Sequence, residues 1–175
     1  MKAALIVFTL VLSNTSVALE TKPYLTLEMA EIMTNTCEAK ASSEGWRKVN
    51  VAIFDDGGNL KLFRRQDDTF LHSIQVSQLK GRTASGMPRS TRALGEFNYA
   101  KPERPYGIEQ VPGLVTFQGG LPIITADGAQ IGGIGGQWRD WRSRRSLGPS
   151  GDRCDRRNVE IGTTTPRNKG DAVSM

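Results

Sequence analysis

The sequence predicts an α/β domain of the α+β type, in which helices pack on a central antiparallel sheet of about five strands. Three observations predict this class. The expected elements run in the order helix, hairpin, helices and three-strand meander, which favours an antiparallel sheet covered by helices. A strong tight-turn signal at 55–58 joins two alternating apolar runs. A glycine-rich meander then occupies 119–135.

The first helix and the hairpin follow from apolar spacing. Thr26 can cap a helix that runs to about Ser43, because apolar residues in this range repeat at intervals of three and four. The runs 49–54 and 60–63 alternate between apolar and polar residues, and the Asp-Asp-Gly-Gly turn separates them. These two runs are therefore predicted to pair as a β-hairpin.

The remaining elements lie between 70 and 135. A second helix is expected over 70–85, and Ser90 opens a short third helix. Prolines and glycines make 98–113 a long loop, a kind of segment that is often functional in compact domains. The three strands of the meander are expected at 114–117, 121–124 and 129–135.

The start of the chain has the pattern of a secretory signal peptide. Lys2 precedes an apolar run of ten residues, Ala3 to Leu12, and small residues follow at 16–18. We therefore assign 1–18 to a signal peptide, with a retained N-terminal anchor as the alternative. The remaining chain is expected to be periplasmic or secreted, with no membrane association after the signal is removed.

The net charge of +5 does not indicate nucleic-acid binding, because of where the charge lies. Residues 19–136 hold 13 basic and 13 acidic side chains and are neutral. Residues 137–175 hold nine basic and five acidic side chains. A basic tail on a neutral body differs from a basic binding face. We expect no nucleic-acid partner.

The residues show no catalytic constellation. The chain has one histidine, with no nucleophile motif beside it, and lacks metal-ligand spacing and a phosphate loop. The sequence thus assigns no catalytic residues and leaves a metal site unknown. Enzymatic activity is left open, with a binding protein favoured.

Two separated blocks of the sequence resemble the GlcG/HbpS family, also called the haem-degrading domain family. The first block is Lys80-x-Arg82-Thr83-Ala84 on the second helix, preceded by the pair Ser73-Ile74. The second block is the meander, with Gly-Gly-Leu-Pro-Ile at 119–123 and a further glycine-rich run at 131–135. The resemblance covers about residues 24–135, so we assign 19–136 to a GlcG/HbpS-like domain.

The resemblance implies an exported protein that binds a small ligand, with haem or a related cofactor as the leading candidate and homo-oligomers as the expected assembly. Two alternatives stay open. One is a non-enzymatic accessory protein of a periplasmic oxidoreductase system, and the other is an enzyme that acts on small hydroxy acids.

Six residues form the predicted ligand-binding set. Imidazole is the commonest axial ligand of haem iron, so His72 is a candidate ligand, although a surface or capping histidine is the alternative. The cationic side chains of the second helix could bind a carboxylate, and glycines of the meander allow close backbone approach. The set is His72, Lys80, Arg82, Thr83, Gly119 and Gly120. The glycines on the last strand, at 132, 133 and 135, have two interpretations. They leave room for a ligand or a neighbouring subunit, or they allow a helix to pack closely on the sheet.

After Gly136 the sequence departs from the family, which continues with a Ser-Gly-x-Thr-Gly-like turn and a final helix. Residues 137–141 read Gln-Trp-Arg-Asp-Trp. Tryptophan has the single codon TGG, which fixes much of the reading frame that starts one base later. That frame must encode Ser or Asn at 137, Gly at 138, a variable residue at 139, Thr or Ile at 140 and Gly at 141, which reproduces the missing turn. We therefore interpret 137–175 as a frameshifted, disordered tail. A genuine arginine-rich tail that binds a partner is the alternative.

Overall fold

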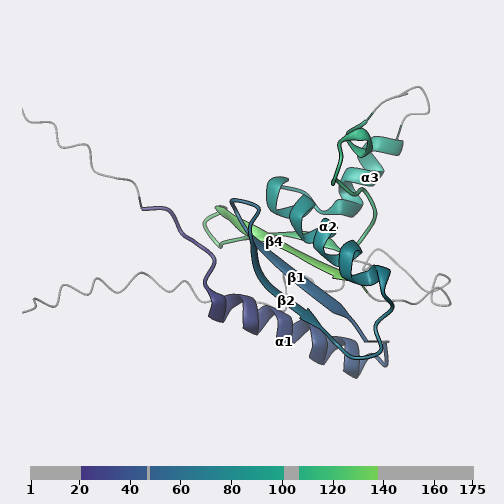
Figure 1. The fold of residues 1–175 in the computed structure, drawn as a ribbon. Helices are drawn as coiled ribbons and strands as arrows, with labels where there is room; N and C mark the ends of the chain where they lie inside the picture. Colours follow the sequence, from purple (N-terminus) through teal and green to yellow (C-terminus); the bar gives the residue numbers. More distant parts are fainter. Residues whose placement is uncertain (1–20, 47, 101–106, 138–175) are drawn as a thin grey trace, which may run out of the picture.

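A single sheet between two helical layers forms the core of the domain (Figure 1). The computed structural model describes residues 21–46, 48–100 and 107–137. The predicted signal peptide and nearly all of the predicted frameshifted tail lie outside these residues. The four described strands are β1 (Asn50–Asp55), β2 (Leu60–Arg65), β3 (Gly120–Ile124) and β4 (Gln130–Gln137).

All strand pairs in this sheet are antiparallel, and the order is β2-β1-β4-β3. The predicted fold class is therefore confirmed, with four strands in the described part of the chain where about five were expected. The hairpin turn forms as predicted. The Asp55 carboxylate accepts hydrogen bonds from the backbone N–H groups of Gly57 and Asn59, and Gly58 has a left-handed φ of 75°.

The predicted strand at 114–117 is wrong. This segment has no strand structure, because side chains of two helices take its backbone hydrogen bonds. The Thr83 hydroxyl accepts from the N–H of Val115 at 3.1 Å, and the Thr91 hydroxyl donates to the carbonyl of Phe117 at 2.7 Å. A segment held this way cannot pair as a strand at the same positions.

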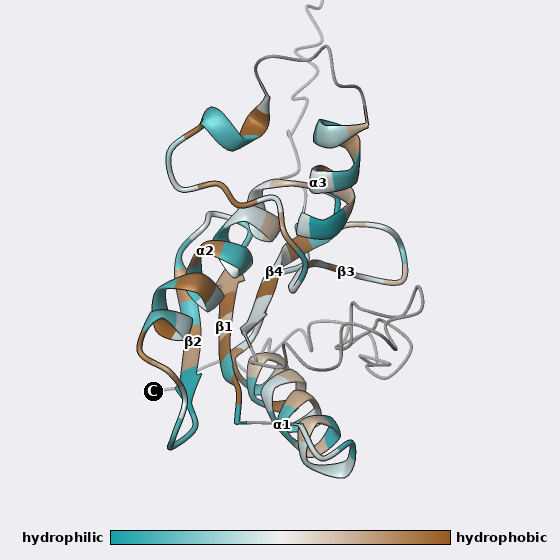
Figure 2. Cartoon of the chain, turned by 90° about the vertical axis from the view of Figure 1, so that its right-hand side faces the viewer, coloured by the Kyte–Doolittle hydropathy of each residue, from teal (hydrophilic) through white to brown (hydrophobic). Residues whose placement is uncertain are grey.

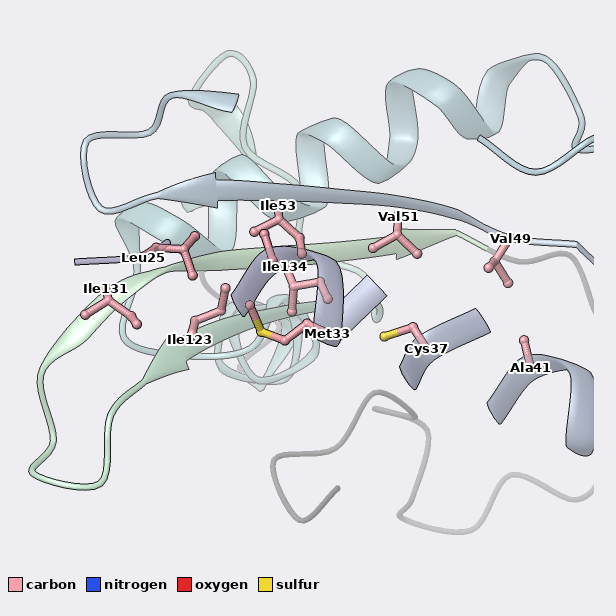
Figure 3. Packing of buried hydrophobic residues seen from close by; sticks show 11 residues of the cluster. Leu25, Met33, Cys37, Ala41, Val49, Val51, Ile53, Ile123, Ile131 and Ile134 are labelled. Carbon is pink, nitrogen blue, oxygen red and sulfur yellow. The ribbon is translucent and has the colours of Figure 1, made fainter. Parts of the chain in front are cut away.

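Helix α1 (Leu27–Ser43) covers the face of the sheet that carries the main apolar core (Figure 3). The Thr26 hydroxyl caps its first turn by accepting from the N–H of Met29 at 3.1 Å, as predicted. The helix contacts β1 and β2. Its buried side chains meet apolar side chains of β1, β3 and β4, and the cluster consists of Leu25, Ala30, Met33, Cys37, Ala41, Val49, Val51, Ile53, Ile123, Ile131 and Ile134.

Helix α2 (His72–Gly86) lies on the opposite face, where it contacts β4, β1 and β3. Its buried face is small and polar. Figure 2 shows that α2 carries mixed hydropathy, whereas β1 is largely hydrophobic. The buried residues of α2 are Ser73, Ser77, Lys80, Gly81, Thr83, Ala84 and Ser85.

Two glycines of β4 explain how such a helix packs. A Cβ on Gly133 would lie 2.6 Å from the carbonyl oxygen of Gly81, and one on Gly135 would lie 2.9 Å from the Cα of Gly81. The helix backbone therefore rests directly on the strand. Of the two sequence interpretations of these glycines, close packing of a helix is the one that the structure supports.

Helix α3 (Thr91–Tyr99) begins at Ser90, whose hydroxyl accepts from the N–H of Ala93 at 3.1 Å. This confirms the predicted short helix and its capping residue. The 3₁₀ turn η1 (Ile108–Gln110) follows, within the predicted long loop 98–113. No helix in the described part of the chain is long and apolar enough to span a membrane.

Candidate functional site

The structure brings four of the six predicted ligand-binding residues together where α2 meets the start of β3. A Cβ on Gly119 would lie 2.9 Å from Nζ of Lys80, and one on Gly120 would lie 2.6 Å from the Lys80 carbonyl oxygen. Thr83 lies one turn further along α2 and holds Val115. Lys80, Thr83, Gly119 and Gly120 thus form one cluster, which we call the Lys80 cluster.

The other two predicted residues do not join this cluster. Arg82 is exposed on α2. His72 is also exposed and lies eight residues before Lys80, which corresponds to about 12 Å along the helix axis. Arg89, an exposed cation just after α2, stacks over the ring of Phe97 at 5.9 Å from its centroid.

The Lys80 side chain is buried, with 3% of its surface exposed. Its ammonium lies 4.6 Å from the centroid of the Phe117 ring, within the range of a cation–π interaction. Burial lowers the pKa of Lys80 from its ordinary value of 10.5 to about 8. The physical cause is the loss of water around the charged form.

Two residues that sequence reasoning missed complete the cluster. The Thr91 hydroxyl accepts from the N–H of Gly120 at 2.9 Å while it donates to the carbonyl of Phe117. Thr91 therefore links the backbone of Phe117, whose ring covers Lys80, to Gly120, the first residue of β3. No sequence signal marks Phe117, but Thr91 follows the capping Ser90 and could have been flagged as a polar residue on a short helix.

The lowered pKa of Lys80 predicts a pH dependence of stability. Between pH 8 and 10.5 the unfolded lysine holds a proton that the folded lysine has lost, so the free energy of unfolding rises with pH across this window. Below pH 8 the full cost of burying the charge remains. Relative to Lys80→Met, which lacks the titrating group, the wild type should gain about 2 kcal/mol across this window.

Urea unfolding of both proteins at pH 7.0, 8.5 and 10.0 measures this difference. Lys61→Met provides the matched control, because Lys61 is exposed on β2 and the same substitution there removes no buried charge. A constant difference between wild type and Lys80→Met over this range would contradict the assignment of a destabilised ammonium to Lys80.

Metal binding has little support in the part of the chain that the structure describes. No group of three or more histidine, cysteine, aspartate or glutamate side chains is placed to hold a metal ion there. The described residues therefore offer a buried cation and an exposed imidazole as their candidate functional groups.

These features define a small α+β domain with one antiparallel sheet between helices and a buried lysine at the edge of that sheet. The chain belongs to the family described as "Haem degrading protein HbpS-like", whose model matches residues 25–136. The predicted family is thereby confirmed, and the match ends where the sequence departs from the expected pattern.

Individual relatives agree with this assignment. The chain is 31% identical over 118 residues to Protein GlcG of Escherichia coli strain K12, which covers 67% of this chain and 84% of GlcG. The crystal structure of HbpS has a TM-score of 0.60 and 28% identity, covering 73% of this chain and 86% of HbpS. A PduOC:heme complex has a TM-score of 0.60 and 27% identity, covering 67% of this chain and 85% of PduOC.

Proposed function

We propose that this chain is an exported protein that binds haem or a related small ligand. The proposal is supported by membership of the HbpS-like family and by similarity to PduOC, which has been solved as a complex with haem. The observation that carries it in this chain is the exposed imidazole of His72, the one histidine of the sequence.

The residues around His72 fit a haem group. An axial ligand must present a free ring nitrogen, and His72 lies exposed at the first position of α2. Leu71 beside it is 72% exposed and offers an apolar surface for a macrocycle. The Lys80 cluster does not contribute to iron binding in this proposal, because its amino group is buried beneath Phe117.

Haem titration tests the assignment of His72. We expect the wild type to shift the Soret band of added haem, and His72→Ala to weaken binding by roughly tenfold or more through loss of the axial ligand. Gln75→Ala is the matched control, since Gln75 is exposed on the same helix. An unchanged spectrum and affinity in His72→Ala would remove His72 from the site, and absence of any Soret shift in wild type would reject haem as ligand.

Export and self-association belong to the same proposal. We expect the mature protein to begin after Ala18 and to be recovered from the periplasm or medium, which intact mass of fractionated protein would show. Several large apolar side chains are more than half exposed, among them Tyr24 and Leu27 near the start of α1 and Phe97 and Tyr99 on α3. Such surface favours homo-oligomers, and light scattering would give their size.

A further inference from the structure

The two helical layers of the domain carry opposite charge. Helix α1 holds three glutamates and one lysine, and it covers one face of the sheet. Helix α2 covers the opposite face and contacts α3 (Figure 1). No acidic residue occurs between Asp68 and Glu96, whereas this stretch contains four cationic ones, Lys80, Arg82, Arg89 and Arg92. The domain therefore has an acidic side and a basic side.

The acidic side is centred on the outer surface of α1. Leu27, Glu28, Glu31 and Ile32 are all exposed there, and their spacing places them within about 140° of the helix circumference. Leu27 and Ile32 each expose 52% of their surface. Neither glutamate takes part in the ion pairs formed among the described residues. We call these four residues the acidic face.

The basic side presents the same combination with the opposite sign. Arg82 near the end of α2 and Arg89 just after that helix are exposed, and they form no ion pair among the described residues. Phe97 and Tyr99 of α3 expose 55% and 69% of their surface. The Arg89 guanidinium lies 5.9 Å from the centroid of the Phe97 ring, which joins the charge to the apolar surface. We call Arg82, Arg89, Phe97 and Tyr99 the basic face.

These two faces are complementary to each other, and each repels a copy of itself. Each combines two large apolar side chains with two charges of one sign. Contact between two acidic faces or two basic faces would bring like charges together, which disfavours a twofold symmetric interface. Contact between unlike faces would pair the charges and remove apolar side chains of both faces from water. Each copy of the chain carries both faces, so every copy supplies the partner that another copy needs.

We propose that the acidic face of one copy docks on the basic face of a second copy. This contact specifies the surfaces of the self-association in the proposed function, and it rests on that self-association. Because the contact is head-to-tail, each bound copy still offers one unused face. Repetition of such a contact gives a closed ring or an open chain of copies, whereas a twofold contact stops at a dimer.

Charge reversal tests the contact in the full chain. One variant combines Glu28→Lys with Glu31→Lys, and the other combines Arg82→Glu with Arg89→Glu. These side chains are exposed, so both variants should fold, which circular dichroism checks. We expect the wild type to form oligomers by light scattering at low salt, and each variant alone to associate more weakly by roughly tenfold or more.

Mixing the two variants distinguishes this contact from a general loss of association. The intact acidic face of one variant fits the intact basic face of the other, and the two reversed faces are also opposite in charge. An equimolar mixture should therefore assemble, although neither variant does so alone. Lys61→Glu is the matched control, since Lys61 is exposed on β2 outside both faces, and this variant should assemble like the wild type.

Three outcomes would overturn the proposal. A monomeric wild type would reject self-association together with this contact, and this includes the case in which the acidic face binds cations of its own chain. Oligomers that survive both reversals would leave self-association standing and reject only these faces. A mixture that stays monomeric would show that the two faces do not meet. Haem titration of the same samples shows separately whether haem binding succeeds or fails.

Discussion

Replacement of Gly135 by alanine is expected to destabilise the domain by roughly 4 kcal/mol or more, enough to unfold much of a small protein. The added Cβ would overlap the carbonyl oxygen of Ser77 and the amide nitrogen of Gly81 and would lie 2.9 Å from the Cα of Gly81. Both neighbours are backbone atoms of α2, so no side-chain rotation relieves the overlap. The helix must move away from β4, with which it makes its most extensive contact.

Urea or thermal unfolding followed by circular dichroism measures the loss. Gly86→Ala is the matched control, because Gly86 ends the same helix and a Cβ there meets nothing within 4 Å. This control should be neutral or slightly stabilising, as expected for alanine in place of glycine. A loss below about 1 kcal/mol in Gly135→Ala would show that α2 can shift at little cost, and the glycine contact would then not fix the helix.

Much of the fold could be predicted from local sequence. The caps Thr26 and Ser90, the turn at 55–58 and the periodic face of α1 each follow from residue types that act within a few positions. These signals depend on short-range sterics and hydrogen bonds. The positions of α1 and the hairpin were therefore predicted with ends close to those observed, and for α3 the start at Ser90 was predicted.

The errors arose where distant contacts decide the structure. The segment 114–117 has the composition of a strand, yet Thr83 and Thr91 bind its backbone from α2 and α3. The second helix was predicted close to its observed position, but its small and polar buried face, which rests on glycines, was not. Neither contact leaves a periodic pattern in the sequence.

Only part of the candidate site could be predicted, again because contacts between distant residues decide the rest. The family motifs gave Lys80, Thr83, Gly119 and Gly120, which the fold brings together. The sequence could not show that Arg82 is exposed while Lys80, two residues earlier, is buried. Burial depends on which side of α2 meets the sheet. The covering ring of Phe117 is 37 positions away in the chain and became visible only in the structure.

Removal of one base near codon 136 is expected to raise the stability of the expressed protein by about 3 kcal/mol. We propose that the sequence after residue 136 arises from a one-base shift. The match to the family model supports this position, since it ends at residue 136. The restored frame reads Ser or Asn, Gly, a variable residue, Thr or Ile, and Gly at 137–141.

An unsatisfied group in the core indicates what the restored frame would supply. Asn50 is fully buried, and its amide donates to the Ser73 hydroxyl at 2.7 Å, but its carbonyl oxygen Oδ1 has no donor among the described residues. An orphaned buried acceptor costs about 1–3 kcal/mol. Position 137 is the cross-strand partner of Asn50, and cross-strand partners share a face of the sheet. A serine or asparagine at 137 would place a short donor beside this oxygen.

The apolar face of the sheet adds to the expected gain. Ile123 and Ile134 are already buried on this face, whereas Leu121 of β3 is only partly buried. An amphipathic helix in the restored frame would complete the burial of Leu121, which is worth up to about 1.5–3 kcal/mol. The test compares both chains by urea unfolding, after resequencing codons 130–145. Asn50→Leu separates the two contributions. Both chains lose the hydrogen bond to Ser73, but the present chain also loses an orphaned acceptor, whereas the restored chain would lose a second hydrogen bond, so the restored chain should be weakened more. Equal stability of both chains, with the extra base confirmed in the gene, would instead make the arginine-rich tail a genuine part of the protein.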